Sequence, residues 1–265
     1  MTEVERPVIF GEVLYDCFPD GQMVLGGAPF KVAWHLPALG LSPVFISRVG
    51  DDPLGHRVRD AMPHHGMDAS GLQLDSSYPT GKVTIALSGS GHSFEILADQ
   101  AYDHIDQGAL PPLPGATLFY HGSLVARSPV SAKTLACLCS RYNDRRLVDV
   151  NLRSPWWQRE QVLDLIEGAW LAKLNDEELC ELVPGEADEA SRMQRLLGNA
   201  GLHLMLLTRG AAGAELLAST GDSVRVVPDT VTRVVDTVGA GDALTSVVIA
   251  GVLHGWPHRQ TLQRA

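Results

Sequence analysis

The sequence predicts an α/β fold in which a mostly parallel central sheet is flanked by helices and carries a small β-hairpin lid. Two observations support this prediction. From residue 117 onward, short apolar runs alternate with longer amphipathic runs, which indicates strands alternating with helices and therefore a parallel sheet covered on both faces. Residues 82–97 break that rhythm, because apolar positions alternate on both sides of Ser-Gly-Ser-Gly, as in an antiparallel hairpin.

The first part of the chain is organised around a glycine pair in "LGGAPFKVAWHLPALG". The run "VIFGEVLYD", residues 8–16, indicates a strand that ends in polar residues. A helix is expected from about Pro29, because proline is favoured in the first helical turn, where its missing N–H leaves no hydrogen bond unmade. The other elements expected here are a strand at 42–52, a helix at 52–66, and lid strands at about 12–25 and 80–100.

The second part of the chain alternates regularly. The expected strands are residues 117–125, 146–153, 170–175 and 202–210. The expected helices are residues 131–143, 159–169, 176–183, 189–200 and 240–253. The segments "GAELLA" and "SVRVVP" indicate a second hairpin. At 265 residues, 45% of them hydrophobic, the chain is predicted to form a single domain spanning 1–265 with a substantial core.

The charge balance excludes several classes of partner. Lys and Arg number 21 against 31 Asp and Glu, giving a net charge of −10, which argues against nucleic-acid or anionic-membrane binding through bulk charge. No apolar run reaches the roughly 18 residues of a transmembrane helix, and the N-terminus lacks a signal-peptide pattern. The four scattered cysteines indicate reduced thiols. We therefore expect a cytoplasmic protein that binds neither nucleic acid nor membranes.

The segment "VVDTVGAGDALTSVVIAGVLHG", residues 234–255, places Asp242 at the start of an apolar helix. A helix-capping role, worth about 1 kcal/mol, would explain the acid alone. It does not explain Gly239 and Gly241, which would let backbone N–H groups approach an anion closely. An acid beside such an anion hole suits a general base that deprotonates an alcohol as it attacks a phosphoryl group. Both readings remain open on these residues alone.

Three further segments place polar residues at expected strand ends. Asp16 is expected at the carboxyl end of the first strand, where open α/β sheets bind ligands, and its carboxylate suits sugar hydroxyls. Asn175 and Glu178 lie at a strand-to-helix junction and could face phosphate and hydrated Mg²⁺, or could simply cap the helix. "LTRGAAGA", residues 207–214, could line nucleotide phosphates or turn a hairpin.

Taken together, these segments resemble the pfkB (ribokinase-like) family of carbohydrate kinases, with fructokinases closest. "DTVGAGD" is similar to the family's C-terminal signature, and "GGAPFKVAWHLPALG" resembles its N-terminal signature. The segments "FGEVLYDCFP", "SRVGDDPLG", "AYDHI", "DVNLRSPWW", "KLNDEEL" and "LTRGAAGA" resemble family segments in the same order, so the resemblance covers nearly the whole chain. A P-loop and a dinucleotide-binding G-x-G-x-x-G are both absent from the sequence.

The resemblance implies a role for each residue at a matching position. Asp242 would be the catalytic base, with Gly239, Ala240 and Gly241 as the anion hole. The sugar would be held by Asp16, Gly26, Gly27 and Lys31, with Asn151 and Arg153 facing the cleft between sugar and phosphate. ATP would lie along Asn175, Thr208, Gly210 and Gly213, and Glu178 would organise Mg²⁺. The resemblance also implies that the lid can serve as a homodimer surface.

Two departures from the family pattern bear on specificity. Lys31 stands where the family has Asn, so a group that only donates hydrogen bonds replaces one that both donates and accepts. Lys31 would weaken or change sugar recognition, pair with Asp16, or point out of the site. Family members also usually continue beyond the last helix expected here, so the C-terminal end looks truncated and we expect weak ATP binding.

The resemblance implies ATP-dependent phosphorylation of a sugar hydroxyl, with fructose as the expected acceptor and fructose 6-phosphate as the product. Two alternatives stay open. One is a kinase for another acceptor, such as 2-keto-3-deoxygluconate, which Lys31 would suit. The other is a non-catalytic sugar- or nucleotide-binding protein on the same fold.

Overall fold

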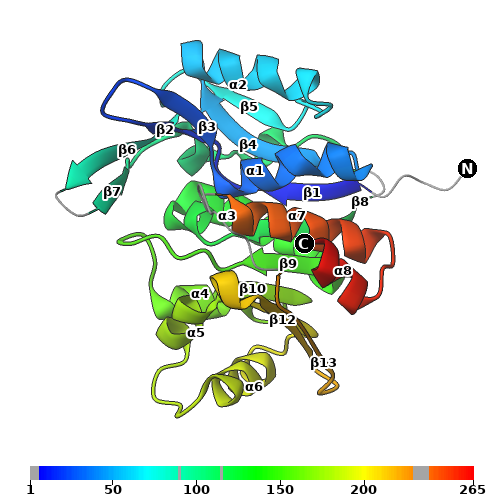
Figure 1. Ribbon diagram of the computed structural model, residues 1–265. Helices are drawn as coiled ribbons and strands as arrows, with labels where there is room; N and C mark the ends of the chain where they lie inside the picture. The colour runs from blue at the N-terminus through cyan, green and yellow to red at the C-terminus, as the bar shows by residue number, and fades with distance from the viewer. Residues whose placement is uncertain (1–5, 89–90, 114–115, 229–238) are drawn as a thin grey trace, which may run out of the picture.

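The computed structural model describes residues 6–88, 91–113, 116–228 and 239–265, and shows a large twisted sheet with helices on both faces (Figure 1). Within these residues nine strands form the large sheet. Their spatial order is β13 (Ser223–Val226), β12 (Ala214–Ala218), β11 (Leu204–Thr208), β10 (Leu171–Asn175), β9 (Arg146–Asp149), β8 (Ala116–Gly122), β1 (Arg6–Phe10), β4 (Val44–Gly50) and β5 (Leu72–Asp75). All neighbours pair in parallel except β11–β12 and β12–β13, which are antiparallel. The mostly parallel sheet and the second hairpin are therefore confirmed.

Helices cover both faces of this sheet. They are α1 (Ala28–His35), α2 (Pro53–His64), α3 (Pro129–Arg141), α4 (Arg159–Ile166), α5 (Asp176–Leu182), α6 (Glu189–Asn199), α7 (Ala240–Leu253) and α8 (His258–Arg264). All of the expected helices form, within a few residues of their predicted ends. They are the helix predicted from about Pro29 and those predicted at 52–66, 131–143, 159–169, 176–183, 189–200 and 240–253. No helix in the described part of the chain is long and apolar enough to cross a membrane.

Alternation along the strands determines which helices pack on which face. On β1, Ile9 belongs to the core formed with α1, α2, α7 and α8, whereas Val8 and Phe10 belong to the core under α3. A third core packs β9, β10 and β11 against α4, α5 and α6. Successive side chains of a strand point to opposite faces, so a strand covered on both sides must be apolar throughout. This explains why β1, β4 and β8 appear in the sequence as continuous apolar runs.

The helices α1 and α7 lie side by side although they come from opposite ends of the chain (Figure 1). The Ser246 hydroxyl on α7 donates a hydrogen bond to the Val32 carbonyl on α1 over 3.2 Å, across 214 positions of sequence. This packing brings the glycine pair before α1 close to the glycines that open α7.

A second, smaller sheet has the order β3 (Met23–Gly26), β2 (Leu14–Cys17), β6 (Gly81–Ser88) and β7 (Gly91–Ile96). The hairpin predicted for residues 82–97 is confirmed as β6–β7, and its turn residues 89–90 lie outside the described residues. In Figure 1 this sheet extends away from the edge of the large sheet.

One expectation for the first strand is wrong. Residues 8–16 are not a single strand, because the chain leaves the large sheet after Phe10 and starts β2 of the small sheet at Leu14. Asp16 is therefore on the small sheet, not at the carboxyl end of a central strand. Gly11 causes the break: its φ is +153°, and a β-carbon there would lie 2.4 Å from the Pro29 ring. Only glycine tolerates that combination.

The strand order reverses between β1 and β8. Strands on one side of this point come from the N-terminal part of the chain, and those on the other side come from residues after 115. In open α/β sheets, ligands bind at the carboxyl ends of the strands beside such a switch point. The segments after β1, β9, β10 and β11 therefore meet at one edge of the sheet.

Candidate active site

A cavity of about 600 Å³ opens at this edge, between the large sheet and the small one. Eleven of the residues singled out in the sequence line it: Asp16, Gly27, Lys31, Asn151, Arg153, Asn175, Glu178, Thr208, Gly239, Gly241 and Asp242. Residues from six separate segments, up to 226 positions apart, are thus brought to one site. Another cavity, of about 400 Å³, lies among α4, α5 and α6 and is lined by none of them.

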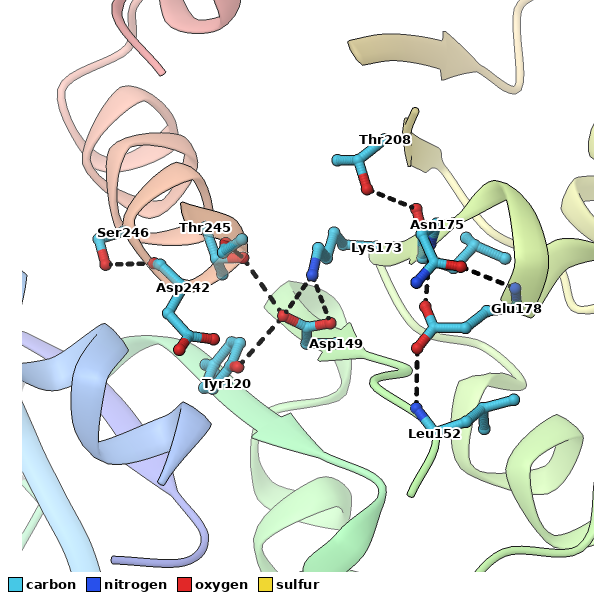
Figure 2. A network of polar contacts seen from close by, with 12 residues as sticks. Tyr120, Asp149, Leu152, Lys173, Asn175, Glu178, Thr208, Asp242, Thr245 and Ser246 are labelled. Atoms are coloured by element: carbon cyan, nitrogen blue, oxygen red, sulfur yellow. Dashed lines mark hydrogen bonds and ion pairs between the residues drawn. The ribbon is translucent and has the colours of Figure 1, made fainter. Parts of the chain in front are cut away.

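Asp242 is not the N-cap residue of its helix. The N-cap of α7 is Gly239, whose φ of +86° is left-handed, and Asp242 occupies the third helical position, where its side chain makes no hydrogen bond to any residue that the structure describes. Figure 2 shows its carboxylate directed away from the helix and bonded to none of the residues drawn. The structure therefore does not support the capping explanation for this acid.

The environment of Asp242 raises its pKa to about 6. Burial is the largest cause, and the negative charge of Asp149 adds to it. The positive charges of Lys31, Lys173 and Arg153 oppose the shift. A carboxyl group with this pKa is mostly ionised at neutral pH and is still basic enough to accept a proton.

A buried ion pair that the sequence analysis did not identify lies behind Asp242 (Figure 2). The Lys173 ammonium on β10 donates to both carboxylate oxygens of Asp149 on β9, at 2.9 and 3.0 Å. The Thr245 hydroxyl on α7 also donates to Asp149, over 3.3 Å, with the Tyr120 hydroxyl at 3.5 Å. Asp149 is fully buried and Lys173 is 8% exposed.

The Lys173 ammonium also lies beside the glycines at the start of α7. A β-carbon placed on Gly241 would lie 3.4 Å from its Nζ atom. Burial is the largest single influence on the pKa of Lys173 and would lower it, but Asp149, Glu178 and Asp242 together raise it, so the ammonium stays charged. A fixed positive charge therefore faces the N-terminus of α7. The sequence signal for the Asp149–Lys173 pair was one charged residue inside each of two apolar runs, "RLVDV" and "WLAKLN".

Asn175 and Glu178 adopt the capping arrangement that the sequence left open. The Asn175 side chain accepts from the Glu178 N–H at 2.8 Å, and the Glu178 carboxylate accepts from the Asn175 N–H at 2.9 Å. The second Glu178 oxygen accepts from the Leu152 N–H at 2.8 Å, which ties the β9–α4 loop to α5 (Figure 2). Burial raises the pKa of Glu178, and these amides oppose the shift. Both residues line the cavity as well, so capping and ligand binding are compatible.

Asp16 and Lys31 both line the cavity and form no ion pair within the described structure. Burial raises the pKa of Asp16, and the Lys31 charge opposes that shift more than the Arg153 charge does. Lys31 does not point out of the site: its Nζ lies 4.0 Å from the position of a β-carbon on Gly239, as does one Asp242 oxygen. Lys31 therefore lies between the acid of the small sheet and the acid of α7.

Asn151 and Arg153 follow β9 and reach the same cavity. Asn151 has a φ of +39°, an uncommon conformation for a residue other than glycine. Such backbone strain clusters at functional sites, where the surrounding structure holds it in place. Arg153 is exposed, and its side chain donates only to the neighbouring Leu152 carbonyl among the described residues.

Four of the predicted site residues do not line the cavity: Gly26, Ala240, Gly210 and Gly213. Gly26 lies behind Asp16, because a β-carbon there would be 2.8 Å from a carboxylate oxygen. Gly213 has a structural reason to be glycine, since a β-carbon would lie 2.1 Å from the Val226 carbonyl oxygen. Ala240 is exposed at the start of α7. Residues 236–238, which begin the "DTVGAGD" segment, lie outside the described residues.

The small sheet supplies the apolar side of the cavity. Leu14, Val83, Phe94 and Ile96 line it, and Phe94 is 59% exposed. One face of this sheet therefore forms a wall above the polar floor, and the exposed aromatic ring is available to a ligand.

The donor set of the site suits a metal that arrives with a ligand. No group of three His, Cys, Asp or Glu side chains that could hold a metal ion occurs among the described residues. Mg²⁺ usually keeps several waters and binds through one or two carboxylates together with substrate phosphates. Glu178 provides one such carboxylate, and each of its oxygens has lone pairs left beyond the backbone amides it accepts from.

Comparison with known proteins identifies the family. The pfkB family carbohydrate kinase profile matches residues 10–265. The chain is 32% identical to a fructokinase of Klebsiella pneumoniae over 264 residues, covering 94% of this chain and 85% of that protein. The fold is similar to that of an ATP-bound fructokinase from Xylella fastidiosa, with a TM-score of 0.86, 22% identity and coverage of 98% and 85% of the two chains.

A second solved structure, the fructose-, ADP- and calcium-bound fructokinase from Vibrio cholerae, has a TM-score of 0.84 and 21% identity, covering 98% of this chain and 89% of that one. Both structural likenesses concern the ribokinase-like fold. The family profile and the Klebsiella relative extend over nearly the whole sequence. The chain therefore belongs to the pfkB family of carbohydrate kinases.

Proposed function

We propose that this protein transfers the γ-phosphoryl group of ATP to fructose, forming fructose 6-phosphate and ADP. The observation that carries the proposal is the Asp242 carboxylate. It is partly buried, has a pKa raised to about 6, is not the N-cap residue of its helix, and lies at the glycine-rich N-terminus of α7. Fructose as the acceptor is supported by the fructokinase from Klebsiella pneumoniae, at 32% identity.

In the proposed step, Asp242 accepts the proton of the primary hydroxyl as that oxygen forms a bond to the γ-phosphorus. The bond between the γ-phosphorus and the β–γ bridging oxygen breaks in line, and ADP leaves. The backbone N–H groups of Gly239, Ala240 and Gly241 and the Lys173 ammonium stabilise the charge on the transferring group, because fixed donors in a buried site need no reorganisation.

The two substrates occupy different parts of the cavity in this proposal. Asp16, Gly27, Lys31, Asn151 and Arg153 hold the sugar, and Asn175 and Thr208 lie along ATP. Glu178 would hold Mg²⁺ through water, and the ion would neutralise phosphate charge. The small sheet acts as the lid, and its exposed Met23 and Val24 support a homodimer through this sheet.

The test is ADP release with Mg-ATP and fructose by three proteins: wild type, Asp242→Asn and Asp60→Asn. Asp60 is exposed on α2 and makes no side-chain hydrogen bond among the described contacts, so it is a matched control. Turnover should fall by about 10²–10⁴-fold in Asp242→Asn only. Equal turnover in Asp242→Asn would refute the base, and a wild type that binds sugar or ATP without turnover would indicate a binding protein.

A second acceptor is supported by Lys31, whose ammonium lies in the cavity without an ion pair to Asp16. A positive charge at the sugar end would suit an acceptor that carries a carboxylate. The substrate panel therefore includes 2-keto-3-deoxygluconate. Turnover with it and not with fructose would keep the mechanism and change the specificity.

A further inference from the structure

We propose that Glu12, between β1 and β2, is a further acceptor-binding residue whose carboxyl group forms a hydrogen bond with one hydroxyl of the sugar. The inference rests on the proposed function and adds a specificity-determining residue to the same site. Sequence reasoning assigned no role to this residue, although it lies within the segment "FGEVLYDCFP".

The backbone around Glu12 is held against the start of α1. A β-carbon on Gly27, the residue before α1, would lie 2.6 Å from the Glu12 carbonyl oxygen. On its other side, Gly11 packs equally closely against the ring of Pro29. Because both neighbouring contacts are this tight, the backbone of Glu12 is held against α1, and the residue lines the cavity together with Asp242 and Arg153.

The carboxyl group of Glu12 has an oxygen without a partner. The residue is only 4% exposed, and no donor in the described structure reaches its Oε2 atom. Buried polar atoms in folded proteins nearly always have a hydrogen-bond partner, so an exception at a cavity indicates that a ligand supplies it. No Lys, Arg or His nitrogen within the described residues lies within ion-pair distance of this carboxylate.

The surroundings select the chemistry of that partner. Burial is the largest influence on the pKa of Glu12 and raises it to about 7, with a smaller contribution from the negative charge of Asp242. The backbone amides of Glu12 and Ala28 and the positive charge of Arg153 oppose the shift. At neutral pH the group is therefore partly protonated, and can both donate and accept. A neutral hydroxyl, which also does both, fits this group. An anion would be repelled by two neighbouring carboxyl groups.

The experiment measures the binding of fructose and its monodeoxy analogues, without ATP, by calorimetry. The proteins are wild type, Glu12→Ala and Glu12→Gln, which keeps the shape of the side chain. Fructose affinity should fall about tenfold in Glu12→Ala and less in Glu12→Gln. One analogue lacks the hydroxyl that Glu12 contacts. The wild type and Glu12→Ala should bind this analogue with equal affinity. That affinity should also equal the affinity of Glu12→Ala for fructose.

Thermal unfolding separates recognition from a structural role. Because the buried oxygen has no protein partner, both variants should keep or raise the melting temperature, whereas a structural carboxylate would lower it. Unchanged fructose affinity in Glu12→Ala, or an equal loss for every analogue, overturns the inference.

The two proposals can fail separately. If the wild type binds fructose but releases no ADP, and Glu12→Ala selectively loses fructose affinity, the kinase proposal is refuted and this inference is retained. A wild type that binds no sugar overturns both.

Discussion

The Lys173 ammonium donates to both carboxylate oxygens of Asp149, at 2.9 and 3.0 Å, while lying beside Gly241 at the start of α7. The pair thus connects β10, which runs into Asn175, with the helix that carries Asp242. Asp149 also accepts from Thr245, three residues after Asp242 (Figure 2). One buried carboxylate therefore orients both the Lys173 ammonium and the helix that carries Asp242.

Asp149→Asn should destabilise the protein by about 3–5 kcal/mol, because it leaves the buried Lys173 ammonium without its counter-charge. Adding Lys173→Met should restore part of that loss, since the amide introduced by Asp149→Asn could still bond Thr245 and no charge would remain unpaired. Urea denaturation of the two single variants and the double variant gives the coupling energy.

The exposed pair Arg195–Glu186 is the matched control. Arg195 is 55% exposed, so Glu186→Gln should change the free energy of unfolding by less than about 1 kcal/mol. A loss in Asp149→Asn no larger than this would show that the buried pair is not coupled as the structure indicates.

The rate should follow the ionisation of Asp242. Its pKa is raised to about 6, and in the proposed mechanism the deprotonated form is the base. Below that pH, kcat/KM should fall about tenfold per pH unit, and above it the profile should level off. Asp149 raises this pKa, so Asp149→Asn should move the acid limb to lower pH, which a purely structural loss would not do. An acid limb at the same pH in Asp149→Asn and in the wild type would contradict the electrostatic coupling between Asp149 and Asp242.

Lys31→Asn should move the same limb in the opposite direction, because the Lys31 charge lowers the pKa of Asp242. It should also lower the KM for fructose, since Asn can accept as well as donate hydrogen bonds to sugar hydroxyls. Steady-state kinetics across pH with fructose and with 2-keto-3-deoxygluconate measures both effects. A fructose KM equal to that of the wild type would dismiss Lys31 as a specificity residue.

The sequence predicted the layout of the large sheet well because both of its faces are covered. Strands such as β1 and β4 are then uniformly apolar, and helices such as α6 keep one apolar side, so periodicity distinguishes them. Lid strands were expected from about residue 12, but the break after Phe10 was not located, because residues 8–16 remain mostly apolar while the chain passes from one sheet to the other. Only the close packing of Gly11 on Pro29 reveals it.

The candidate site was predicted where glycines and acids follow strands. Asp242, Asn175 and Asp16 meet in one cavity as expected. Glu12, Asp149 and Lys173 were missed, because their importance depends on burial and on partners from other strands. A charge inside an apolar run is a usable signal, since it must find a partner when the run is buried. Gly213 shows the converse: a glycine that suggested phosphate binding is required by the Val226 carbonyl.

The packing of α7 on α1 has a consequence for synthesis of the protein. Ser246 bonds to Val32 across 214 positions, so the inner side of α1 stays uncovered until nearly the whole chain has left the ribosome. Contacts of such long sequence separation form slowly and leave apolar surface open to aggregation meanwhile. The nascent N-terminal half should therefore depend on chaperones, and Asp242 should reach the residues at the start of α1 only late in folding.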